Sequence, residues 1–343
     1  MKTAAIILAA GQSTRMNSDL PKVLHEVCGR PMLFYVLDAC RRAGISPIYV
    51  VVGHRHELVR AAFADDRDLV WIHQTERKGT GHAVLCCEAA MADIDGNVVV
   101  IAGDMPLVRT ATVEALLTEH QRTGQAVTLA TAVLPDSMAY GRIIRDSSGK
   151  LIRIVEERDC TPEQLAIREV NLSYYCFEKS ALFEALHKIK PNPLKGEYYL
   201  TDAVHIMVSA GQAAGAISAV PPEDAIGINS REELALVGRM MQQRIQRQWM
   251  AAGVTLVDPA TTWINHGATI GRDTVIQPFT FIDGGSVVGR ECRIGPFACL
   301  TRGDRLGDGE SIGGLSTVER VADRGTSRSG SATRRAPEGA VNR

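Results

Sequence analysis

The chain has 343 residues, a length that predicts two or three domains, each large enough to bury its own hydrophobic core. Hydrophobic residues make up 45% of the sequence and charged residues 22%, which is the balance of a soluble globular protein. The formal net charge of −1 gives no general reason to expect nucleic-acid binding, and no apolar segment approaches the ~18 residues needed to cross a bilayer.

The cysteines and the N-terminus indicate a compartment. None of the cysteines forms a Cys-x-x-Cys pair and most lie in apolar runs, so we interpret them as reduced, partly buried thiols rather than disulfides or metal ligands. The apolar run at the N-terminus is too short for a secretion signal with a cleavage site. We therefore expect a cytoplasmic protein that is not bound to a membrane.

Over residues 1–132, strand-like runs rich in Val and Ile alternate with runs of helical periodicity. The predicted strands are 4–10, 48–52, 69–72, 98–102 and 126–132, and the predicted helices are 32–42, 57–64, 82–92 and 112–123. This alternation predicts a Rossmann-like α/β domain with a mostly parallel sheet covered on both faces. Ligands of such sheets bind at the carboxyl ends of the strands, so the loops that follow the strands are where a site is expected.

The first of these loops begins at Gly11, which ends the first apolar run. A glycine-containing loop exposes backbone N–H groups that can line a base or a phosphate. Arg15 and Lys22 add two cations that suit a polyphosphate. The alternative is an ordinary strand-to-helix turn with two surface cations. The loop has neither the P-loop pattern nor the Gly-x-Gly-x-x-Gly of dinucleotide-binding folds.

Two further loops carry candidate chemistry. Gly79-Thr80-Gly81 opens a predicted helix and offers N–H donors with little steric cover, or it is a plain helix start capped by Thr80. Asp104 follows a buried strand, directly after Gly103. One carboxylate is enough to anchor Mg²⁺ when phosphate oxygens and water complete its coordination, although an isolated aspartate can also simply close a turn.

Two motifs resemble a known enzyme family. The segment from Leu8 to Met16, followed by Pro21-Lys22, resembles the signature of sugar-nucleotide pyrophosphorylases, with Ser13 where a second glycine is usual. Leu20–His25 and Gly29-Arg30-Pro31-Met32 resemble the bifunctional N-acetylglucosamine-1-phosphate uridyltransferase family in particular. The resemblance covers residues 1–300. It implies that the nucleotide is bound by Leu8, Ala9, Ala10, Gly11, Lys22, Gln74, Gly79, Thr80 and Gly103.

The same resemblance implies a sugar site and a metal site. The sugar would be held by Gly141, Glu156, Asn171, Tyr199 and Thr201. The Mg²⁺ cofactor would be held by Asp104 and Asn229, although Asn229 by itself could equally be an Asx turn or a helix cap. The chain departs from the family at Leu172-Ser173, where Thr-Gly is usual, and at Ala102, where some members carry Tyr, so we expect the sugar side to be reshaped.

The C-terminal third has a different pattern. Residues 232–252 have the periodicity of one amphipathic connecting helix. Aliphatic residues then recur at every sixth position from Ile264 to Val318, which predicts a short parallel β-helix over 253–321. The family resemblance implies that this β-helix is left-handed. We expect its last coil to be weak, because Asp304 and Glu310 replace small residues. The tail at 322–343 has the composition of a disordered segment. The predicted domains are thus 1–231, 232–252, 253–321 and 322–343.

By resemblance, the function is uridylyl transfer from UTP to N-acetylglucosamine 1-phosphate, with Arg15 and Lys22 as the catalytic cations and a homotrimer as the assembly. The family's acetyltransferase site lies in further coils that this sequence does not show, so we do not expect that activity. The alternatives are a nucleotidyltransferase for another nucleoside triphosphate, such as dTTP or CTP, or another sugar, such as glucose 1-phosphate, and a non-catalytic UDP-sugar-binding module. An acetyltransferase is a third alternative, which the short β-helix disfavours.

Overall fold

A computed structural model describes residues 2–11, 14–137, 139–193 and 196–314. The chain divides into two compact units, Met1–Ala252 with Trp263–His266, and Gly253–Thr262 with Gly267–Arg343. The tail that we predicted to be disordered, and the end of the predicted β-helix at 315–321, lie outside the described residues. The four predicted domain ranges remain predictions.

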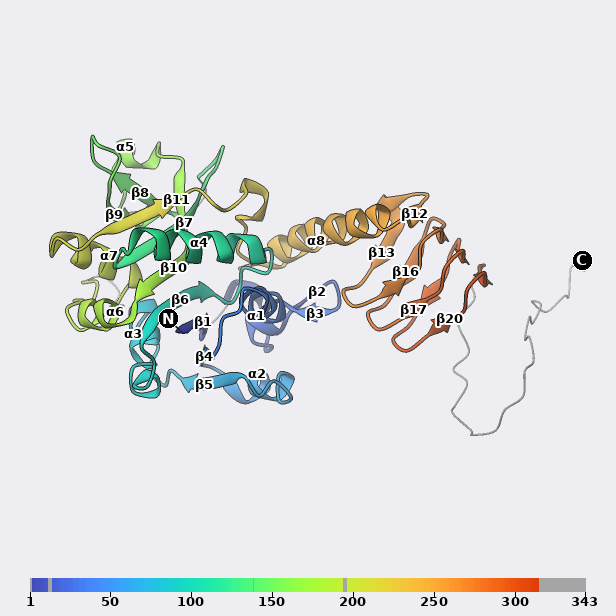
Figure 1. Cartoon of the computed structure of the whole chain (residues 1–343), viewed down its shortest axis with the longest axis horizontal. Helices are drawn as coiled ribbons and strands as arrows, with labels where there is room; N and C mark the ends of the chain where they lie inside the picture. Colours follow the sequence, from blue (N-terminus) through green and yellow to red (C-terminus); the bar gives the residue numbers. More distant parts are fainter. Residues whose placement is uncertain (1, 12–13, 138, 194–195, 315–343) are drawn as a thin grey trace, which may run out of the picture. The chain divides into compact units, whose positions relative to one another are not determined.

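The first unit is built on one nine-stranded sheet whose main path is β11-β7-β10-β6-β1-β4-β5 (Figure 1). The strands of this path are β1 (Lys2–Ala9), β4 (Ile48–Val52), β5 (Leu69–His73), β6 (Gly96–Ala102), β7 (Val127–Val133), β10 (Glu169–Glu178) and β11 (Ala214–Ile217). β1 pairs in parallel with both β4 and β6, and β4 with β5, so their carboxyl ends share one edge. The antiparallel β10 makes the sheet mixed, with the hairpin β8 (Gly141–Arg145) and β9 (Leu151–Val155) attached to it.

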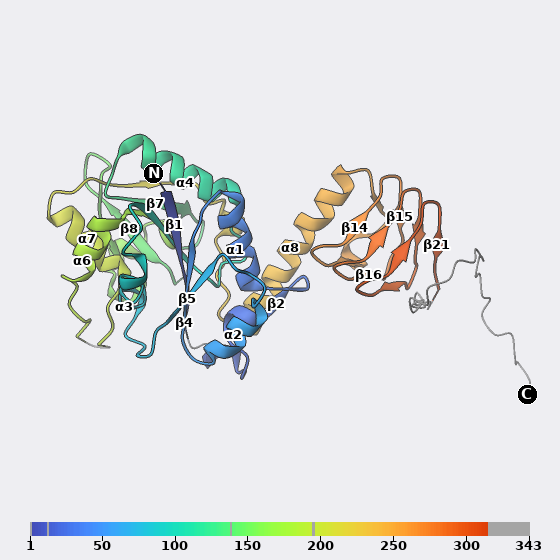
Figure 2. The same ribbon diagram turned by 60° about the horizontal axis from the view of Figure 1, so that its bottom comes forward.

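Both faces of this sheet are buried. Alternate residues of β1, such as Ile6 and Ile7, point to opposite faces, and both are fully buried. One face packs in a single apolar cluster with α3 (Thr80–Leu85), α6 (Lys179–Leu186) and α7 (Leu200–Ser209). Figure 2 shows α1 (Met32–Arg42) and α4 (Thr110–Thr123) on the other side of the sheet. The predicted two-sided α/β domain is confirmed.

The remaining elements of this unit are short, apart from one long helix. They are β2 (Glu26–Val27), β3 (Arg30–Pro31), α2 (His56–Ala62), α5 (Pro162–Leu165) and α8 (Arg231–Ala251). α8 matches the predicted connecting helix to within one residue, and its start is fixed by a reciprocal capping box between Ser230 and Glu233. No helix of the described chain has the length and apolarity that a membrane span requires. All eight cysteines lie within the described residues and are free thiols in this structure.

One predicted helix is wrong in its extent. We expected a continuous helix over 82–92, but α3 ends at Leu85. The backbone then tightens, because Cys87 N donates to Val84 O at 2.9 Å and Glu88 N donates to Leu85 O at 3.1 Å. These bonds span three residues rather than four, so the chain continues as a turn and a short 3₁₀ segment. Apolar periodicity is similar for the two geometries and did not separate them.

The second unit consists of parallel strands in hexapeptide repeats, consistent with a left-handed parallel β-helix (Figure 2). Its strands are β12 (Thr255–Leu256), β14 (Thr269–Ile270), β15 (Val275–Ile276), β16 (Thr280–Ile282), β17 (Val287–Val288), β18 (Arg293–Ile294), β19 (Cys299–Leu300), β20 (Arg305–Leu306) and β21 (Ser311–Ile312), while β13 (Thr262–Ile264) spans the division between the units. Val287 pairs with Thr269 before it and Arg305 after it, so one coil takes three six-residue sides.

The aliphatic ladder fills the interior of these coils. Ile276, Ile282, Ile294 and Leu300 are each 0% exposed, whereas Leu306 and Ile312 are only partly buried. Asp304 occupies a repeat position at which the earlier coils have a small residue. Its buried carboxylate accepts hydrogen bonds from the amide and hydroxyl of Thr301 at 2.6 and 3.0 Å. The last described coil therefore has fewer buried apolar groups, and its weakness stays a prediction.

We expect Ile276→Ala to lower the free energy of unfolding of the second unit by about 2–5 kcal/mol, because it removes a fully buried side chain and leaves a cavity. Ile312→Ala is the matched control at an equivalent ladder position that is partly exposed, and we expect a smaller loss. Urea unfolding followed by hydrogen exchange of peptides from 253–314 measures both. Equal losses in the two variants would contradict a ladder that weakens toward its end.

Candidate functional site

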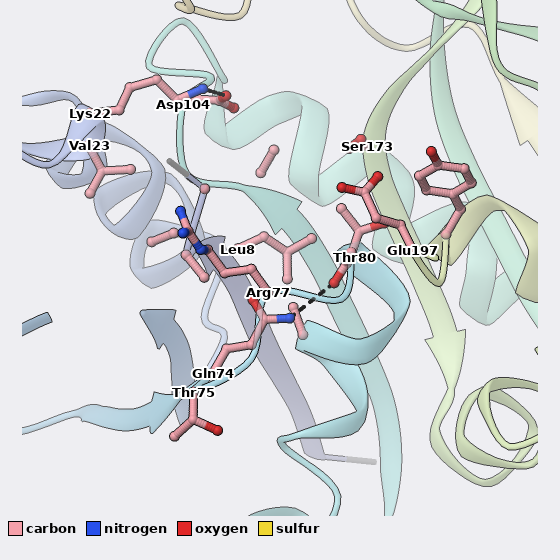
Figure 3. A pocket seen from close by; sticks show the side chains of 17 residues that line it. Leu8, Lys22, Val23, Gln74, Thr75, Arg77, Thr80, Asp104, Ser173 and Glu197 are labelled. Atoms are coloured by element: carbon pink, nitrogen blue, oxygen red, sulfur yellow. Dashed lines mark hydrogen bonds and ion pairs between the residues drawn. The ribbon is translucent and has the colours of Figure 1, made fainter. Parts of the chain in front are cut away.

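A cavity of about 840 Å³ lies at the carboxyl ends of β1, β5 and β6 (Figure 3). It is lined by eight of the nine residues predicted to bind the nucleotide, namely Leu8, Ala9, Ala10, Gly11, Lys22, Gln74, Gly79 and Thr80. Gly103 is not part of the lining. Its amide donates to Leu8 O at 2.9 Å, and a Cβ at this position would lie 3.1 Å from the same oxygen. Gly103 therefore sets the close approach of two loops beside the cavity.

Gln74 is held rigidly at one end of this cavity. Gln74 is only 4% exposed, and its side-chain Nε2 lies 3.1 Å from Gly79 O and 3.0 Å from His82 Nδ1. Both contacts fix the amide plane, so the group meets a ligand in one orientation. Sequence reasoning gave His82 no part in the site and missed this contact with Gln74.

The backbone at Gly79 is possible only for glycine. Its φ is +93°, and a Cβ there would lie 2.5 Å from Tyr198 O. Thr80 does not cap α3, because its hydroxyl accepts a hydrogen bond from Leu200 N at 3.0 Å. The loop is thus tied to the segment that begins α7. The segment does start a helix, as the alternative had it, but the capping role weighed for Thr80 is wrong.

Lys22, Asp104 and Asn229 form a cluster at the other end of the cavity. Lys22 Nζ donates to Asp104 Oδ2 at 2.5 Å and to Asn229 Oδ1 at 3.0 Å. Figure 3 shows Lys22 and Asp104 pointing toward each other, with Gln74 and Thr75 at the opposite end. Asn229 is not the helix cap, since Ser230 caps α8 and leaves the Asn229 side chain to face the lysine. Two hard oxygen atoms therefore converge on one cationic position.

A second cavity, of about 650 Å³, contains all five residues predicted to bind the sugar: Gly141, Glu156, Asn171, Tyr199 and Thr201. Several of them are already fixed by hydrogen bonds. Thr201 Oγ1 donates to Glu156 Oε1 at 3.0 Å, and Asn171 Nδ2 donates to Tyr175 Oη at 2.7 Å. Burial and the adjacent Glu197 carboxylate raise the pKa of Tyr199 to about 12.

Arg15 lines the second cavity and not the first. It lies in the 3₁₀ turn Thr14–Met16, and its side chain is exposed. The two predicted catalytic cations therefore belong to different cavities, with Lys22 held by two partners and Arg15 at the surface.

Ser173 is a site residue whose role the sequence did not predict. Its φ of +60° is unusual for a residue with a side chain, and it lies where the pairing of β10 with β7 shifts register between Asn171 and Tyr175. Ser173 lines both cavities, whereas Leu172 is 2% exposed and lines neither. We expected bulk at Leu172-Ser173 to reshape the sugar side; the structure assigns that contact to Ser173 and buries Leu172 in the core.

The two cavities are contiguous. Leu8, Thr80, Ser173 and Tyr199 each line both of them. Ligands in the two cavities would therefore lie next to each other, which is the arrangement that a transfer between two bound substrates needs.

Comparison with known proteins agrees with these features. Residues 5–188 match the MobA-like NTP transferase domain, and residues 267–302 match the six-repeat bacterial transferase hexapeptide. The bifunctional protein GlmU of Pelotomaculum thermopropionicum is 46% identical over 280 residues, covering 82% of this chain and 61% of that protein. That of Geobacter metallireducens is 45% identical over 275 residues, covering 80% and 58%. These relatives confirm the resemblance seen in the sequence motifs, but this chain spans only about three fifths of their length.

Among solved structures, a UDP-glucose pyrophosphorylase complexed with UDP-glucose superposes with a TM-score of 0.58 at 18% identity, covering 71% of this chain and 100% of that one. This likeness supports the fold of the first unit. Because this family model matches residues 5–188, more than half of the chain, the chain belongs to the MobA-like NTP transferase family.

Proposed function

We propose that the protein transfers the uridylyl group of UTP to N-acetylglucosamine 1-phosphate, which yields UDP-N-acetylglucosamine and pyrophosphate. The observation that carries this proposal is the pair of contiguous cavities that share Leu8, Thr80, Ser173 and Tyr199. The substrates themselves come from the family resemblance. The free thiols agree with a reducing, cytoplasmic location for the reaction.

The nucleotide occupies the first cavity in this proposal. The rigid Gln74 amide reads the edge of the base, and the Gly11 loop and Gly79 allow the backbone to approach it closely. The hexosamine occupies the second cavity, where Glu156 and Asn171 supply fixed acceptors and donors for its hydroxyl and amide groups. Its phosphate then lies at the shared wall, facing the nucleotide.

The proposed reaction does not depend on acid–base catalysis by side chains. The attacking sugar phosphate is already ionised at neutral pH, so no general base is required. The protein must align the two phosphates and neutralise the charge that develops on the α-phosphate and on the leaving pyrophosphate. Lys22 carries out this neutralisation from the first cavity, and Arg15 assists from the second.

The residues around Lys22 also fit a divalent cation. The Asp104 carboxylate and the Asn229 amide oxygen are hard ligands of the kind Mg²⁺ prefers, and both already contact the lysine ammonium, a cation, at 2.5 and 3.0 Å. Asp104 and Asn229 would hold the ion, which would supply charge neutralisation for the phosphates. Lys22 would donate to a phosphate oxygen of the nucleotide.

We expect Lys22→Ala and Asp104→Ala each to lower kcat for pyrophosphate formation by about a hundredfold to a thousandfold, because each removes charge stabilisation of the transition state. Lys150→Ala, at an exposed hairpin position, is the matched control and should keep its activity. Circular dichroism checks that the variants fold. A Lys22→Ala enzyme with near-normal kcat would refute the proposed role.

We expect Ser173→Gly to raise KM for the sugar phosphate several-fold with little change in KM for UTP. Ser173 N donates to Asn171 Oδ1 at 3.2 Å, and a more flexible glycine would loosen this sugar-binding amide. The substitution also relieves an unfavourable positive φ, so stability should not fall. Ser209→Gly at the exposed end of α7 is the control. Unchanged KM values for every sugar phosphate would contradict this role.

A substrate panel separates the alternatives. Pyrophosphate release is measured with UTP, dTTP and CTP against N-acetylglucosamine 1-phosphate and glucose 1-phosphate. We expect the highest kcat/KM with UTP and the N-acetylated sugar. Binding of UDP-sugar without any pyrophosphate release would favour a non-catalytic module. Turnover of acetyl-CoA would overturn our expectation that the acetyltransferase activity is absent.

A homotrimer is the assembly that hexapeptide repeats favour. Phe279 and Phe297 lie one coil apart, are 56% and 51% exposed, and stack with ring centroids 5.1 Å apart. Such exposed aromatic pairs are typical of a surface that a partner covers. Sedimentation equilibrium should give a trimer, and the double variant Phe279→Ser/Phe297→Ser should shift the protein toward monomer. A wild-type monomer at micromolar concentration would contradict the assembly.

A further inference from the structure

A third cavity, of about 270 Å³, lies at the same edge of the sheet, between the ends of β4 and β5. Its lining comes from two short segments that the parallel pairing brings together, 53–56 after β4 and 73–77 at the end of β5. None of the functional assignments above uses it, apart from the residues that it shares with the nucleotide cavity.

The described residues that line this cavity are two arginines, three histidines and three neutral residues, with no carboxylate among them. They are Gly53, His54, Arg55, His56, His73, Gln74, Thr75 and Arg77. The guanidinium groups of Arg55 and Arg77 are positively charged at any physiological pH, and each imidazole offers at least one N–H donor even when neutral. A carboxylate in contact with this lining is that of Glu57, whose Oε2 lies 4.0 Å from His56 Nε2. Two guanidinium groups and three imidazoles outweigh that single negative charge, and such a set of donors favours an anion.

Contacts with neighbouring groups fix several side chains of this cavity in place. The rings of His56 and His73 lie 4.1 Å apart between centroids, and Arg55 is held in a left-handed conformation with φ of +52°. Arg55 donates to Asp19 O at 2.8 Å, which uses one of its five N–H groups. His56 Nδ1 is buried and has no hydrogen-bond partner among the described residues. A buried polar atom without a partner is costly and is explained when a ligand supplies the missing bond.

This cavity adjoins the nucleotide cavity at the end remote from Lys22. Gln74, Thr75 and Arg77 line both cavities. Gln74 and Thr75 lie at the opposite end of the nucleotide cavity from the Lys22–Asp104 contact (Figure 3). An anion here is therefore separate from the phosphates that Lys22 would neutralise.

We propose that the cavity formed by 53–56 and 73–77 is a second anion site, which binds a phosphate group next to the base-binding end of the nucleotide cavity. The phosphate group belongs either to free phosphate or pyrophosphate or to a phosphorylated small molecule. This inference rests on the residues of the cavity and does not require the proposed uridylyl transfer.

The test titrates inorganic phosphate, and separately pyrophosphate, into the full-length protein at constant ionic strength, while NMR follows the imidazole resonances of His54, His56 and His73. The resonances are assigned with single His→Gln variants. We expect saturable shifts of these resonances. Arg55→Gln should raise the Kd about tenfold, because it removes one charge-assisted hydrogen bond donor. Arg60→Gln, an exposed arginine on α2 outside the cavity, is the matched control and should leave the Kd unchanged.

Two further measurements distinguish the possible phosphate ligands and guard against a variant that does not fold. Tighter binding of pyrophosphate than of phosphate indicates a polyphosphate ligand, and equal binding indicates a single phosphate group. His73→Gln gives a second variant if Arg55→Gln disturbs the local fold. The proposal is overturned if the shifts do not saturate, if Arg60→Gln weakens binding as much as Arg55→Gln, or if Lys22→Ala abolishes the shifts, since that would move the bound anion to the nucleotide cavity.

Discussion

The contact of one ammonium group with two oxygen atoms holds the candidate active site together. Lys22 reaches Asp104, 82 residues away, and Asn229, 207 residues away. These three residues come from the loop after β1, the loop after β6 and the segment before α8. An ammonium ion in a partly buried position needs such oxygen partners, and the two oxygens in turn need a cation. The cluster therefore joins the first and last parts of the nucleotidyltransferase unit at one point.

This contact is possible because of how parallel strands are ordered. β1 lies between β4 and β6, and all three point the same way, so the loops after them must meet at one edge. The loop that carries Gln74 and Gly79 follows β5, one strand further along, and the cavity lined by residues 53–56 and 73–77 lies where β4 and β5 end. The same rule that gathers the lining of the first cavity also gathers the histidines and arginines beside it.

Backbone constraints complete the site. Gly79 has a positive φ and no room for a Cβ against Tyr198 O, which holds its loop close to the start of α7. Ser173 also has a positive φ without being glycine, where the strand pairing shifts register, and it lines both cavities. A bulge re-aims one side chain while the flanking strand pairing continues, so the sheet absorbs the irregularity. In both places the function of a residue follows from its backbone geometry.

The amino-acid sequence by itself determined the two-sided α/β unit, the long helix before the repeats and the six-residue register of the coils. These features depend on local apolar periodicity, which each segment carries within itself. Eight of the nine residues that the resemblance assigned to the nucleotide line one cavity, and their role in binding stays a prediction.

Only the tertiary structure decided that Leu172 is buried in the core while Ser173 lines both cavities, and that His82 contacts the Gln74 amide. It also decided that Arg15 and Lys22 line different cavities. Finally, it brought three histidines and two arginines together in one cavity. Each of these facts is a contact or a direction between segments distant in sequence. Such contacts are fixed by packing and strand order, which no local pattern encodes.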